Sequence, residues 1–379
     1  MIVSFPHMGD LNIALKALFT GLGQQVLPPP PVSKRTLEIG VRYSPEAVCL
    51  PFKIALGNFI EALEQGADTL VTCGGAGPCR LGYYAEIQRG ILQNLGYQFK
   101  MIVFEPAIGN FFASLRQIAP KQSFWEIGAA FRLALAKLNA LDAIQRQTYR
   151  IRPREINAGE ADAAREAAAA AIDAANTLPE LKAARDKAER RLAGVKLRPG
   201  ANPLRVGVIG EIYVMLEPFA NFDLDRRLGR MGVEVHKTML LSDYVNGHLF
   251  RKREYLSLFS RLAELARPYL GHYVGGHGLK SIAHTVKMSR EDCDGMIHVF
   301  PFSCMPEVIA RNILPKVSKD TGIPVLSLAF DEQSGEAGVV TRLEAFLDVL
   351  RQRRAFFCLQ EGNNLGESEF PAKQNTIQH

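Results

Sequence analysis

Short apolar segments with the composition of buried strands alternate with helix-length segments in the first 145 residues of the chain. Thr69–Thr72 runs directly into a pair of glycines, and Phe99–Phe104 is closed by Glu105 and Pro106. Between them, Tyr83–Leu95 has the apolar spacing that is typical of a helix, and it stops at a glycine. Strands that alternate with helices of this length favour a parallel sheet covered by helices on both faces.

The same alternation begins again after residue 200. Leu204–Ile209, Met296–Phe300 and Pro324–Ala329 are strand candidates. Val308–Val317 and Thr341–Leu350 have the length and spacing of helices that would cover such a sheet. A second α/β domain is therefore expected in this part of the chain.

The intervening residues 158–192 are rich in alanine, glutamate, arginine and lysine. This composition strongly favours helix and carries no strand signal, and an interruption at Thr177–Pro179 divides it into a hairpin. We therefore predict an α/β protein with an N-terminal domain over residues 1–145, a helical connection over 146–200, a C-terminal domain over 201–358 and a loose polar tail over 359–379.

The composition fits a globular protein with enough residues for two cores. The chain has 379 residues, of which 47% are apolar and 22% are charged. Its net charge is +6, but the basic residues are scattered, so we expect a solvated surface and no nucleic-acid partner. The sequence shows neither a signal-peptide pattern nor a run of eighteen apolar residues, so we expect a cytoplasmic protein without a membrane partner. In that compartment, clustered cysteines indicate metal binding or catalysis rather than disulfides.

Cysteines stand next to predicted helix starts in three separate loops. Cys73 and Cys79 belong to the glycine-rich stretch TCGGAGPCR, which follows a predicted strand. Cys304 lies between a predicted strand and a predicted helix, and Cys49 shortly precedes the helix predicted at Ile54–Glu64. Because ligands of open α/β sheets gather outside the carboxyl ends of the strands, we expect these four thiols to converge.

The neighbours of these cysteines suit a negatively charged metal cluster. Gly74, Gly75 and Gly77 allow the loop to bend and to direct N–H groups at an anionic core, and a helix N-terminus stabilises thiolates. Arg80 and Lys53 are candidates for offsetting the cluster charge and tuning its potential. Four thiolates are the ligand set of a [4Fe–4S] cluster, and they are also a ligand set for zinc, so both metals stay open.

Two further cysteines do not fit the same site. Cys293 precedes the Met296–Phe300 strand, whereas Cys304 follows it, so extended chain of about 30 Å separates the two. Cys358 is placed in the C-terminal tail, beyond the last predicted helix. We therefore expect neither to be a ligand.

Other polar residues near the predicted site have two interpretations each. Glu211 directly follows a predicted strand, so it is either an acid–base group beside the cluster or a helix-capping carboxylate. Glu307 is read as the first-turn acid of a helix. The glycine-rich stretch Gly271–His284 contains three histidines and is interpreted as a loop over the cleft rather than a metal site. It contains no complete GxGxxG motif, so no NAD site is expected.

The segments around these residues resemble a known group of proteins. They are YSPEAVCLPFK, GADTLVTCGGAGPCR, VGVIGEIYV, DGMIHVFPFSCMPE and LAFDEQSGEAGVVTRLEAF, which together extend over nearly the whole chain. In these segments the sequence resembles the branch of the 2-hydroxyacyl-CoA dehydratase superfamily that is associated with CoA-substrate-specific enzyme activases and related to double-cubane cluster proteins.

This resemblance implies two Rossmann-like, doubly wound domains with an iron–sulfur cluster in the cleft between them. It also implies an ASKHA-type ATPase activase as partner, which carries a cluster itself and uses ATP hydrolysis to deliver an electron at very low potential. Members of the superfamily use that electron to dehydrate a 2-hydroxyacyl-CoA or, in double-cubane cluster proteins, to reduce small molecules.

The sequence departs from the dehydratases in the number of candidate ligands. Dehydratases proper are two-subunit enzymes whose clusters have three cysteine ligands and one iron open to substrate, whereas four cysteines are candidates here. A fully ligated [4Fe–4S] cluster would suit electron transfer better than substrate binding. An [8Fe–9S] double cubane would need Cys293 and Cys358, or a second chain as in a homodimer, and we rank it below a single cube.

Three functions follow as hypotheses. The first is an iron–sulfur redox protein that passes electrons from an activase to a small molecule or partner. The second is a two-domain binding or adaptor protein stabilised by zinc. The third is a subunit of a CoA-thioester dehydratase with one open iron.

Overall fold

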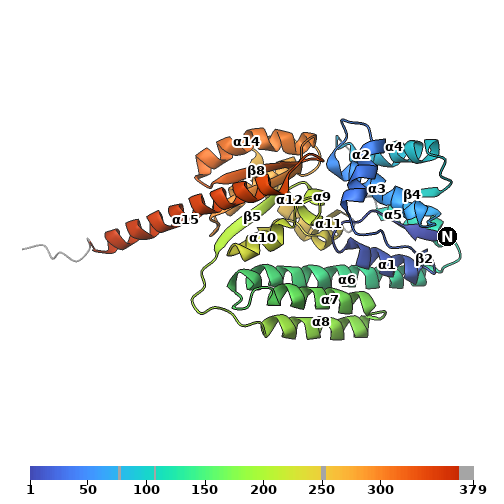
Figure 1. Cartoon of the computed structure of the whole chain (residues 1–379), viewed down its shortest axis with the longest axis horizontal. Coiled ribbons are helices and arrows are strands. Elements are labelled where there is room, and N and C mark those ends of the chain that lie inside the picture. The colour runs from blue at the N-terminus through green and yellow to red at the C-terminus, as the bar shows by residue number, and fades with distance from the viewer. Residues whose placement is uncertain (76–77, 106–107, 249–252, 367–379) are drawn as a thin grey trace, which may run out of the picture. The chain divides into compact units, whose positions relative to one another are not determined.

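The computed structural model describes residues 1–75, 78–105, 108–248 and 253–366 (Figure 1). Contacts divide the chain into two compact units, Met1–Ser334 and Gly335–His379. The first unit contains two four-stranded sheets, and the second contains helix α15 (Glu336–Gly366). Within the described ranges, no helix is both long and apolar enough to cross a membrane.

The first sheet is parallel and has the strand order β2-β1-β3-β4. Its strands are β1 (Ile2–Ser4), β2 (Gln25–Val26), β3 (Thr69–Cys73) and β4 (Lys100–Phe104). The helices between and after them are α1 (Leu11–Gly21), α2 (Lys34–Tyr43), α3 (Leu50–Glu64), α4 (Leu81–Asn94) and α5 (Ile108–Ile118).

Apolar clusters cover both faces of this sheet. Successive residues of β3 point to opposite faces, as strand geometry requires. Val71 packs with Phe19 and Ile102 on one face, whereas Leu70 packs with Phe52 on the other. The predicted parallel sheet covered on both faces is therefore confirmed for this part of the chain.

The second sheet repeats the arrangement with the order β6-β5-β7-β8, again with parallel strands. Its strands are β5 (Leu204–Gly210), β6 (Val233–Lys237), β7 (Gly295–Pro301) and β8 (Val325–Phe330). Its helices are α9 (Ile212–Leu216), α10 (Leu224–Arg230), α11 (Leu241–His248), α12 (Arg253–Ala266), α13 (Gly278–Met288) and α14 (Met305–Thr321).

The strand order determines where each sheet can hold a ligand. In both sheets the chain places its second strand on one side of the first strand and its third strand on the other. Connections that leave neighbouring strands in opposite directions open a crevice at their carboxyl ends, and ligands of such sheets bind there. In the second sheet this point lies between β5, which is followed by Glu211, and β7, which is followed by Cys304.

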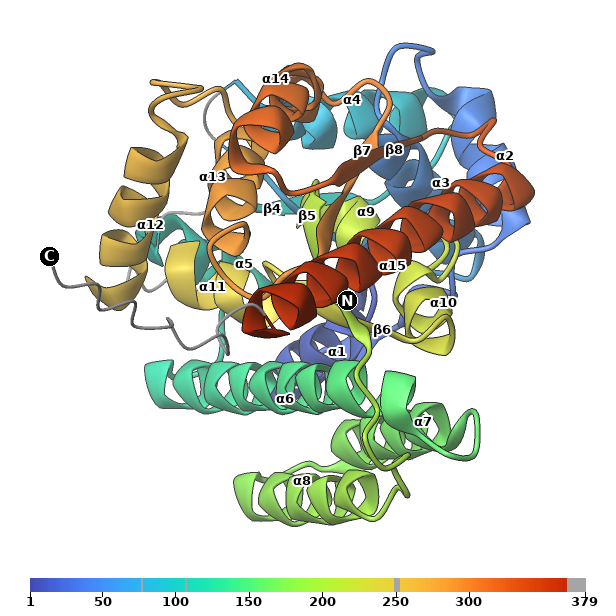
Figure 2. The same cartoon turned by 90° about the vertical axis from the view of Figure 1, so that its left-hand side faces the viewer.

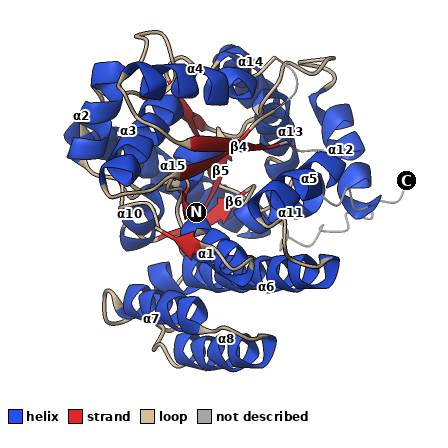
Figure 3. Cartoon of the chain, turned by 90° about the vertical axis from the view of Figure 1, so that its right-hand side faces the viewer, coloured by secondary structure: helices blue, strands red, loops and turns tan. Residues whose placement is uncertain are grey.

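A helical layer joins the two sheets in sequence. It consists of α6 (Phe124–Ile151), the short 3₁₀ helix η1 (Arg152–Arg154), α7 (Glu160–Ala174) and α8 (Leu178–Ala193). Figures 2 and 3 show α6, α7 and α8 stacked on one another beside the sheets. Ser123 and Thr177 cap α6 and α8, and alanine, leucine and isoleucine side chains fill the space between the helices. The structure therefore places a helical hairpin where the sequence predicts one.

The last helix is longer than its sequence pattern predicts. Helix α15 continues to Gly366, because the residues after 350 are mostly good helix formers. The prediction that Cys358 lies beyond the last helix is therefore wrong. The domain boundaries proposed from composition stay predictions.

Candidate metal centre

Three of the four candidate cysteines stand at the starts of helices. Cys49 is the N-cap residue of α3, and Cys304 is the N-cap residue of α14. Both are followed by a proline in the first helical turn, where its fixed φ suits a helix and its missing N–H costs nothing. Cys79 immediately precedes Arg80, the N-cap residue of α4. The helices thus fix the backbone at each of these thiols.

The side chain of Arg80 connects the three loops that carry these cysteines. Its Nη1 donates to the carbonyl oxygen of Ala47 at 2.8 Å, and its Nη2 donates to the carbonyl oxygen of Ser303 at 2.6 Å. Ala47 lies two residues before Cys49, and Ser303 directly precedes Cys304. Because the guanidinium is a rigid fork of donors, it fixes the spacing of the two carbonyls as well as their positions.

The three thiols also share one electrostatic environment. Burial raises the pKa of Cys49 to about 11, raises that of Cys79, and raises that of Cys304 well above its ordinary value. The carboxylate of Glu211 raises all three further, and Arg80 lowers the pKa of Cys49 and Cys79. The Cys49 thiol itself contributes to the shift at Cys304. The carboxylate of Glu211 therefore influences the protonation of all three thiols.

Cys73 has different surroundings. It is the last residue of β3 and lies opposite Phe104 of β4. The residue is exposed, yet protein surrounds its thiol densely enough to raise the pKa to about 11, and the Glu105 carboxylate raises it further. Among the described residues, Glu105 is the only charged group that shifts the Cys73 pKa. Cys73 therefore has Glu105 as its charged neighbour, and none of the other three thiols contributes to its pKa shift.

The glycines after Cys73 serve close packing. The N–H of Gly74 donates to the carbonyl of Phe104 at 2.9 Å, so it extends the sheet. A Cβ atom at Gly74 would lie 2.4 Å from a carboxylate oxygen of Glu105. The backbone of Gly75 packs against Gly82 at the start of α4. Gly77, the third glycine of the predicted cradle, lies outside the described residues.

Lys53 is paired within the protein. It lies in α3, four residues after Cys49, and only 3% of it is exposed. Its amino group forms an ion pair with the carboxylate of Glu332, which follows β8. Glu332 therefore offsets the charge of Lys53. The ion pair joins α3 to the carboxyl end of the second sheet.

Glu211 caps a helix, which is one of the two roles that its sequence position suggests. Its carboxylate caps α9 by accepting hydrogen bonds from the backbone N–H groups of Tyr213 and Val214, both at 3.0 Å. Burial raises its pKa to about 7, and the nearby carboxylate of Glu307 adds to the shift. The group is therefore poised to take up or release a proton near neutral pH beside the three thiols.

Glu307 is more than a first-turn acid. It is fully buried, and its Oε2 accepts a hydrogen bond from the Ser281 hydroxyl at 2.9 Å and lies 2.8 Å from Nε2 of His298. Its Oε1 has no hydrogen-bond partner within the described part of the chain. Carboxylates are common in the first turn of helices, where the helix dipole favours them. The burial of Glu307 beside a histidine and a serine depends instead on the tertiary fold.

Tyr84 is a site residue that the sequence analysis missed. Its hydroxyl oxygen contacts the sulfur of Cys49. The thiol of Cys79 and the carboxylate of Glu211 both raise the pKa of this hydroxyl. Tyr84 follows Arg80 by four residues, so both side chains lie on the same side of α4. That spacing is the one sequence signal that could have indicated Tyr84.

The glycine-rich loop before α13 packs against two of the cysteine loops. A Cβ atom at Gly275 would lie 2.9 Å from Pro78, and one at Gly278 would lie 2.2 Å from the carbonyl oxygen of Pro306. Only glycine allows this approach, and Gly275 also has a φ of +91°. The prediction of a loop over Gly271–His284 is wrong for its second half, because residues 278–284 form the start of α13. Gly275 in the remaining loop and Gly278 at the helix start contact residues near Cys79 and Cys304.

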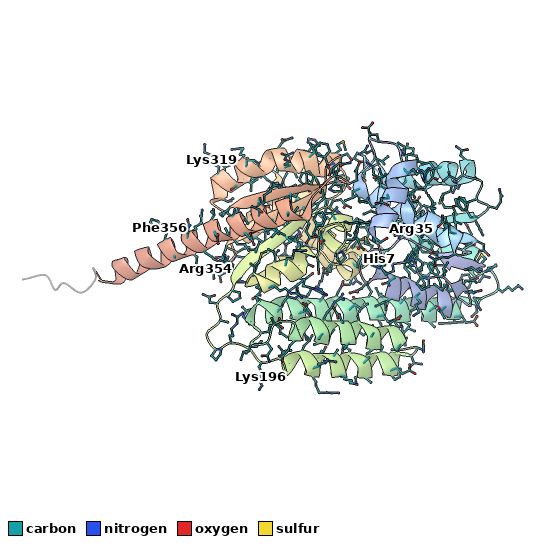
Figure 4. All side chains as sticks on the ribbon, in the orientation of Figure 1. His7, Arg35, Lys196, Lys319, Arg354 and Phe356 are labelled. Carbon is teal, nitrogen blue, oxygen red and sulfur yellow. The ribbon has the colours of Figure 1, made fainter. Side chains whose placement is uncertain are left out.

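Further contacts join the carboxyl ends of the two sheets. His7, which is labelled in Figure 4, follows β1. Its Nδ1 lies 2.8 Å from the carboxylate of Glu217, which follows α9. The hydroxyl of Tyr213 donates to the His7 carbonyl at 3.0 Å. Together with Arg80 and Lys53, these residues hold the loops of the two sheets against each other.

The donor set suits soft metals. Sulfur ligands favour zinc and iron–sulfur clusters over magnesium or calcium, and metal binding would have to displace the protons of the buried thiols. In residues 1–75, 78–105, 108–248 and 253–366, no three His, Cys, Asp or Glu side chains lie close enough to hold one metal ion.

No protein-family model matches this chain, and no curated protein matches it. The resemblance to the dehydratase superfamily therefore stays a prediction.

Proposed function

We propose that this chain is an iron–sulfur redox protein of the 2-hydroxyacyl-CoA dehydratase type, with its cluster at the carboxyl ends of two Rossmann-like domains. The observation that carries the proposal is the bridge made by Arg80. The guanidinium of Arg80 donates hydrogen bonds to the carbonyls of Ala47, two residues before Cys49, and Ser303, directly before Cys304. Arg80 itself directly follows Cys79. Loops from three segments far apart in the sequence, each with one of the three cysteines, are thereby joined at one side chain.

The residues around the thiols have separate roles in this proposal. Cys49, Cys79 and Cys304 bind the cluster, and Arg80 holds their loops in place. Glu211, with a pKa of about 7, stores or supplies a proton beside the cluster. When bound, the cluster supplies a one-electron carrier whose potential depends on nearby charges and hydrogen bonds. The proposed electron donor is an ASKHA-type ATPase activase.

The separate surroundings of Cys73 favour one form of this function. With three cysteine ligands, a cubane cluster keeps one iron without a protein thiolate, as in a CoA-thioester dehydratase. If Cys73 completed the set, the cluster would suit electron transfer. Because Glu105 shifts the Cys73 pKa and none of the other three thiols does, we favour a cluster that binds substrate.

Metal analysis of protein purified without oxygen tests the proposal. We expect about four irons and four acid-labile sulfides per chain, and an EPR signal that changes on reduction. About eight irons would replace the single cube with a double cubane. Stoichiometric zinc without iron would overturn the redox function and support the zinc-stabilised binding protein.

A further inference from the structure

An exposed aromatic patch lies at the turn between α5 and α6. Trp125 is the only tryptophan of the chain and is 89% exposed, and the neighbouring Phe124 is 79% exposed. Phe112 of α5 extends the patch, because it is also exposed and its ring centroid lies 6.0 Å from that of Phe131 in α6. Contiguous exposed aromatic side chains mark interaction surfaces, where tryptophan and phenylalanine are enriched.

The backbone that carries this patch is fixed. Ser123 and Glu126 form a capping box at the start of α6, in which the Glu126 carboxylate accepts hydrogen bonds from the Ser123 N–H and hydroxyl, both at 2.7 Å. Arg116 of α5 lies over the Phe124 ring, 5.1 Å from its centroid, and donates to the carbonyl oxygen of Gln122. The aromatic side chains therefore project from an ordered helix start.

The patch lies at the opposite end of the first sheet from the cysteines. The side chain of Gln24 donates to the carbonyl oxygen of Ile118 in α5 at 3.0 Å, and that of Gln122 donates to the carbonyl oxygen of Leu22 at 3.3 Å. Leu22 and Gln24 precede β2 and so mark the amino end of the strands, whereas Cys73 is the last residue of β3. The patch is therefore separate from the candidate metal centre.

Along α6 the patch continues as a two-turn stripe that is complementary to itself. Four exposed residues lie on one side of the helix, because they follow the first of them by three, four and seven residues: Trp125, Gly128, Ala129 and Arg132. Among the described residues, no atom lies within 4 Å of a Cβ atom built at Gly128. An antiparallel pair of α6 helices that crosses at the two small residues brings Trp125 of each copy opposite Arg132 of the other.

The side chains that meet at this crossing attract each other. A guanidinium over an aromatic ring is a favourable pair, and Arg116 on Phe124 shows it within the same patch. Glu126 stands next to Trp125 and offers an opposite charge to Arg132 of the other copy. The two-fold axis repeats both contacts, so each end of the crossing is matched. These features fit a second copy of this chain.

We propose that α6 forms a two-fold interface with a second copy of this chain, in which Trp125 and Arg132 meet across the axis. The inference does not depend on the proposed function, because no residue of the patch belongs to the candidate metal centre. The interface lies away from the carboxyl end of the first sheet. It would therefore not bring the thiols of one copy to the site of the other.

Sedimentation velocity of the full chain, at concentrations from about 1 to 100 µM, tests whether the interface forms. We expect the sedimenting mass to rise from one chain to two. The emission of Trp125 should shift to shorter wavelengths over the same concentrations, because the indole leaves water. A monomer throughout this range would overturn the proposal. If phosphatidylserine vesicles then shifted the emission of that monomer, the patch would belong to a membrane contact instead.

Charge reversal tests which residues meet. Arg132→Glu places a carboxylate opposite Glu126 of the other copy, and Glu126→Arg places two guanidinium groups opposite each other. Each variant alone should dissociate at least about tenfold more readily than the wild type. An equimolar mixture of the two should restore the dimer, because opposite charges then meet at both ends of the crossing. Circular dichroism checks that each variant folds.

Two further variants complete the test. Trp125→Ser keeps every charge and should also weaken the dimer by at least about tenfold, because tryptophan is a frequent energetic centre of interfaces. Arg191→Glu reverses an exposed arginine of α8 and should leave the dimer unchanged. A mixture as monomeric as its two components would overturn the proposal, and so would a dimer that Trp125→Ser leaves intact or that Arg191→Glu weakens equally.

Discussion

At the residue scale, Glu211 determines how the site responds to pH. Burial raises its pKa from the ordinary range of a glutamate to about 7 in the folded chain. The folded state therefore keeps a proton that the unfolded state releases between about pH 4.5 and pH 7. The contribution of this group to stability is largest below pH 4.5 and is lost as pH rises through 7.

Glu211→Gln should remove this dependence in the metal-free chain while keeping an oxygen that can cap α9. Between pH 5 and pH 8, the free energy of unfolding of the wild type should fall by about 1–3 kcal/mol more than that of the variant. Urea denaturation at both pH values measures the difference. Glu46→Gln, at an exposed position, is the control. Equal pH dependence of wild type and Glu211→Gln would contradict the raised pKa.

The sequence predicts that the cysteines lie next to helix starts, but it does not predict which side chains surround them. Cys49 and Cys304 are expected next to helix starts, and both are N-cap residues. Helix α3 begins at Leu50, four residues before the predicted Ile54, because Pro51 suits the first turn of a helix.

The different charged neighbours of Cys73 and Cys79 were not predictable, because both belong to one short glycine-rich loop. The spacing of Tyr84 from Arg80 indicates its side of α4, but its approach to Cys49 depends on the packing of α4 on α3, which that spacing does not encode.

At the element scale, the position of Cys49 depends on the close packing of α2 and α3. A Cβ atom at Gly40 of α2 would lie 1.9 Å from the carbonyl oxygen of Lys53, and one at Gly57 of α3 would lie 2.0 Å from that of Thr36. The two glycines let the backbones approach reciprocally. Since α3 begins directly after Cys49, displacement of this helix would move the thiol.

Gly57→Ala should therefore lower the free energy of unfolding by about 3 kcal/mol, because backbone atoms rather than flexible side chains block the new methyl group. Gly90→Ala in α4 is the matched control. Nothing lies within 4 Å of a Cβ atom at Gly90, so the alanine should raise helix stability by about 0.5–1 kcal/mol. Chemical denaturation measures both, and a Gly57→Ala variant as stable as the wild type would contradict the close packing.

The strands show which elements a local pattern can reveal. β3, β4, β5, β7 and β8 are apolar runs ended by glycine, proline or acidic residues, and each lies within one or two residues of its prediction. β1 and β2 are three and two residues long, too short for a pattern. β6 carries Glu234, His236 and Lys237, so its strand character depends on pairing with β5.

At the scale of the whole molecule, buried polar pairs join the loops of the two sheets. The strongest case is Lys53 with Glu332, because the lysine is almost fully buried whereas 22% of the glutamate side chain is exposed. Loss of the glutamate leaves a buried cation without its partner, whereas loss of the lysine leaves a carboxylate that water can reach. Removing the glutamate should therefore lower the free energy of unfolding more than removing the lysine.

Glu332→Ala should destabilise the chain by about 3–5 kcal/mol, and Lys53→Met should cost clearly less. Combining the two substitutions should recover most of the loss. Urea denaturation at pH 7 of the two single variants and the double variant measures this. Equal and small effects of the single substitutions would contradict a buried, unequally exposed ion pair.

The account as a whole depends on which cysteines hold metal. The most direct measurement is the iron content per chain of Cys304→Ser, Cys73→Ser and Cys293→Ser after purification without oxygen. We predict that Cys304→Ser loses the iron, whereas Cys73→Ser and Cys293→Ser keep it. Cys293 lies at the opposite end of β7 and is the control. Full iron content in Cys304→Ser, or complete loss in Cys73→Ser, would contradict a cluster held by the three thiols that Arg80 brings together.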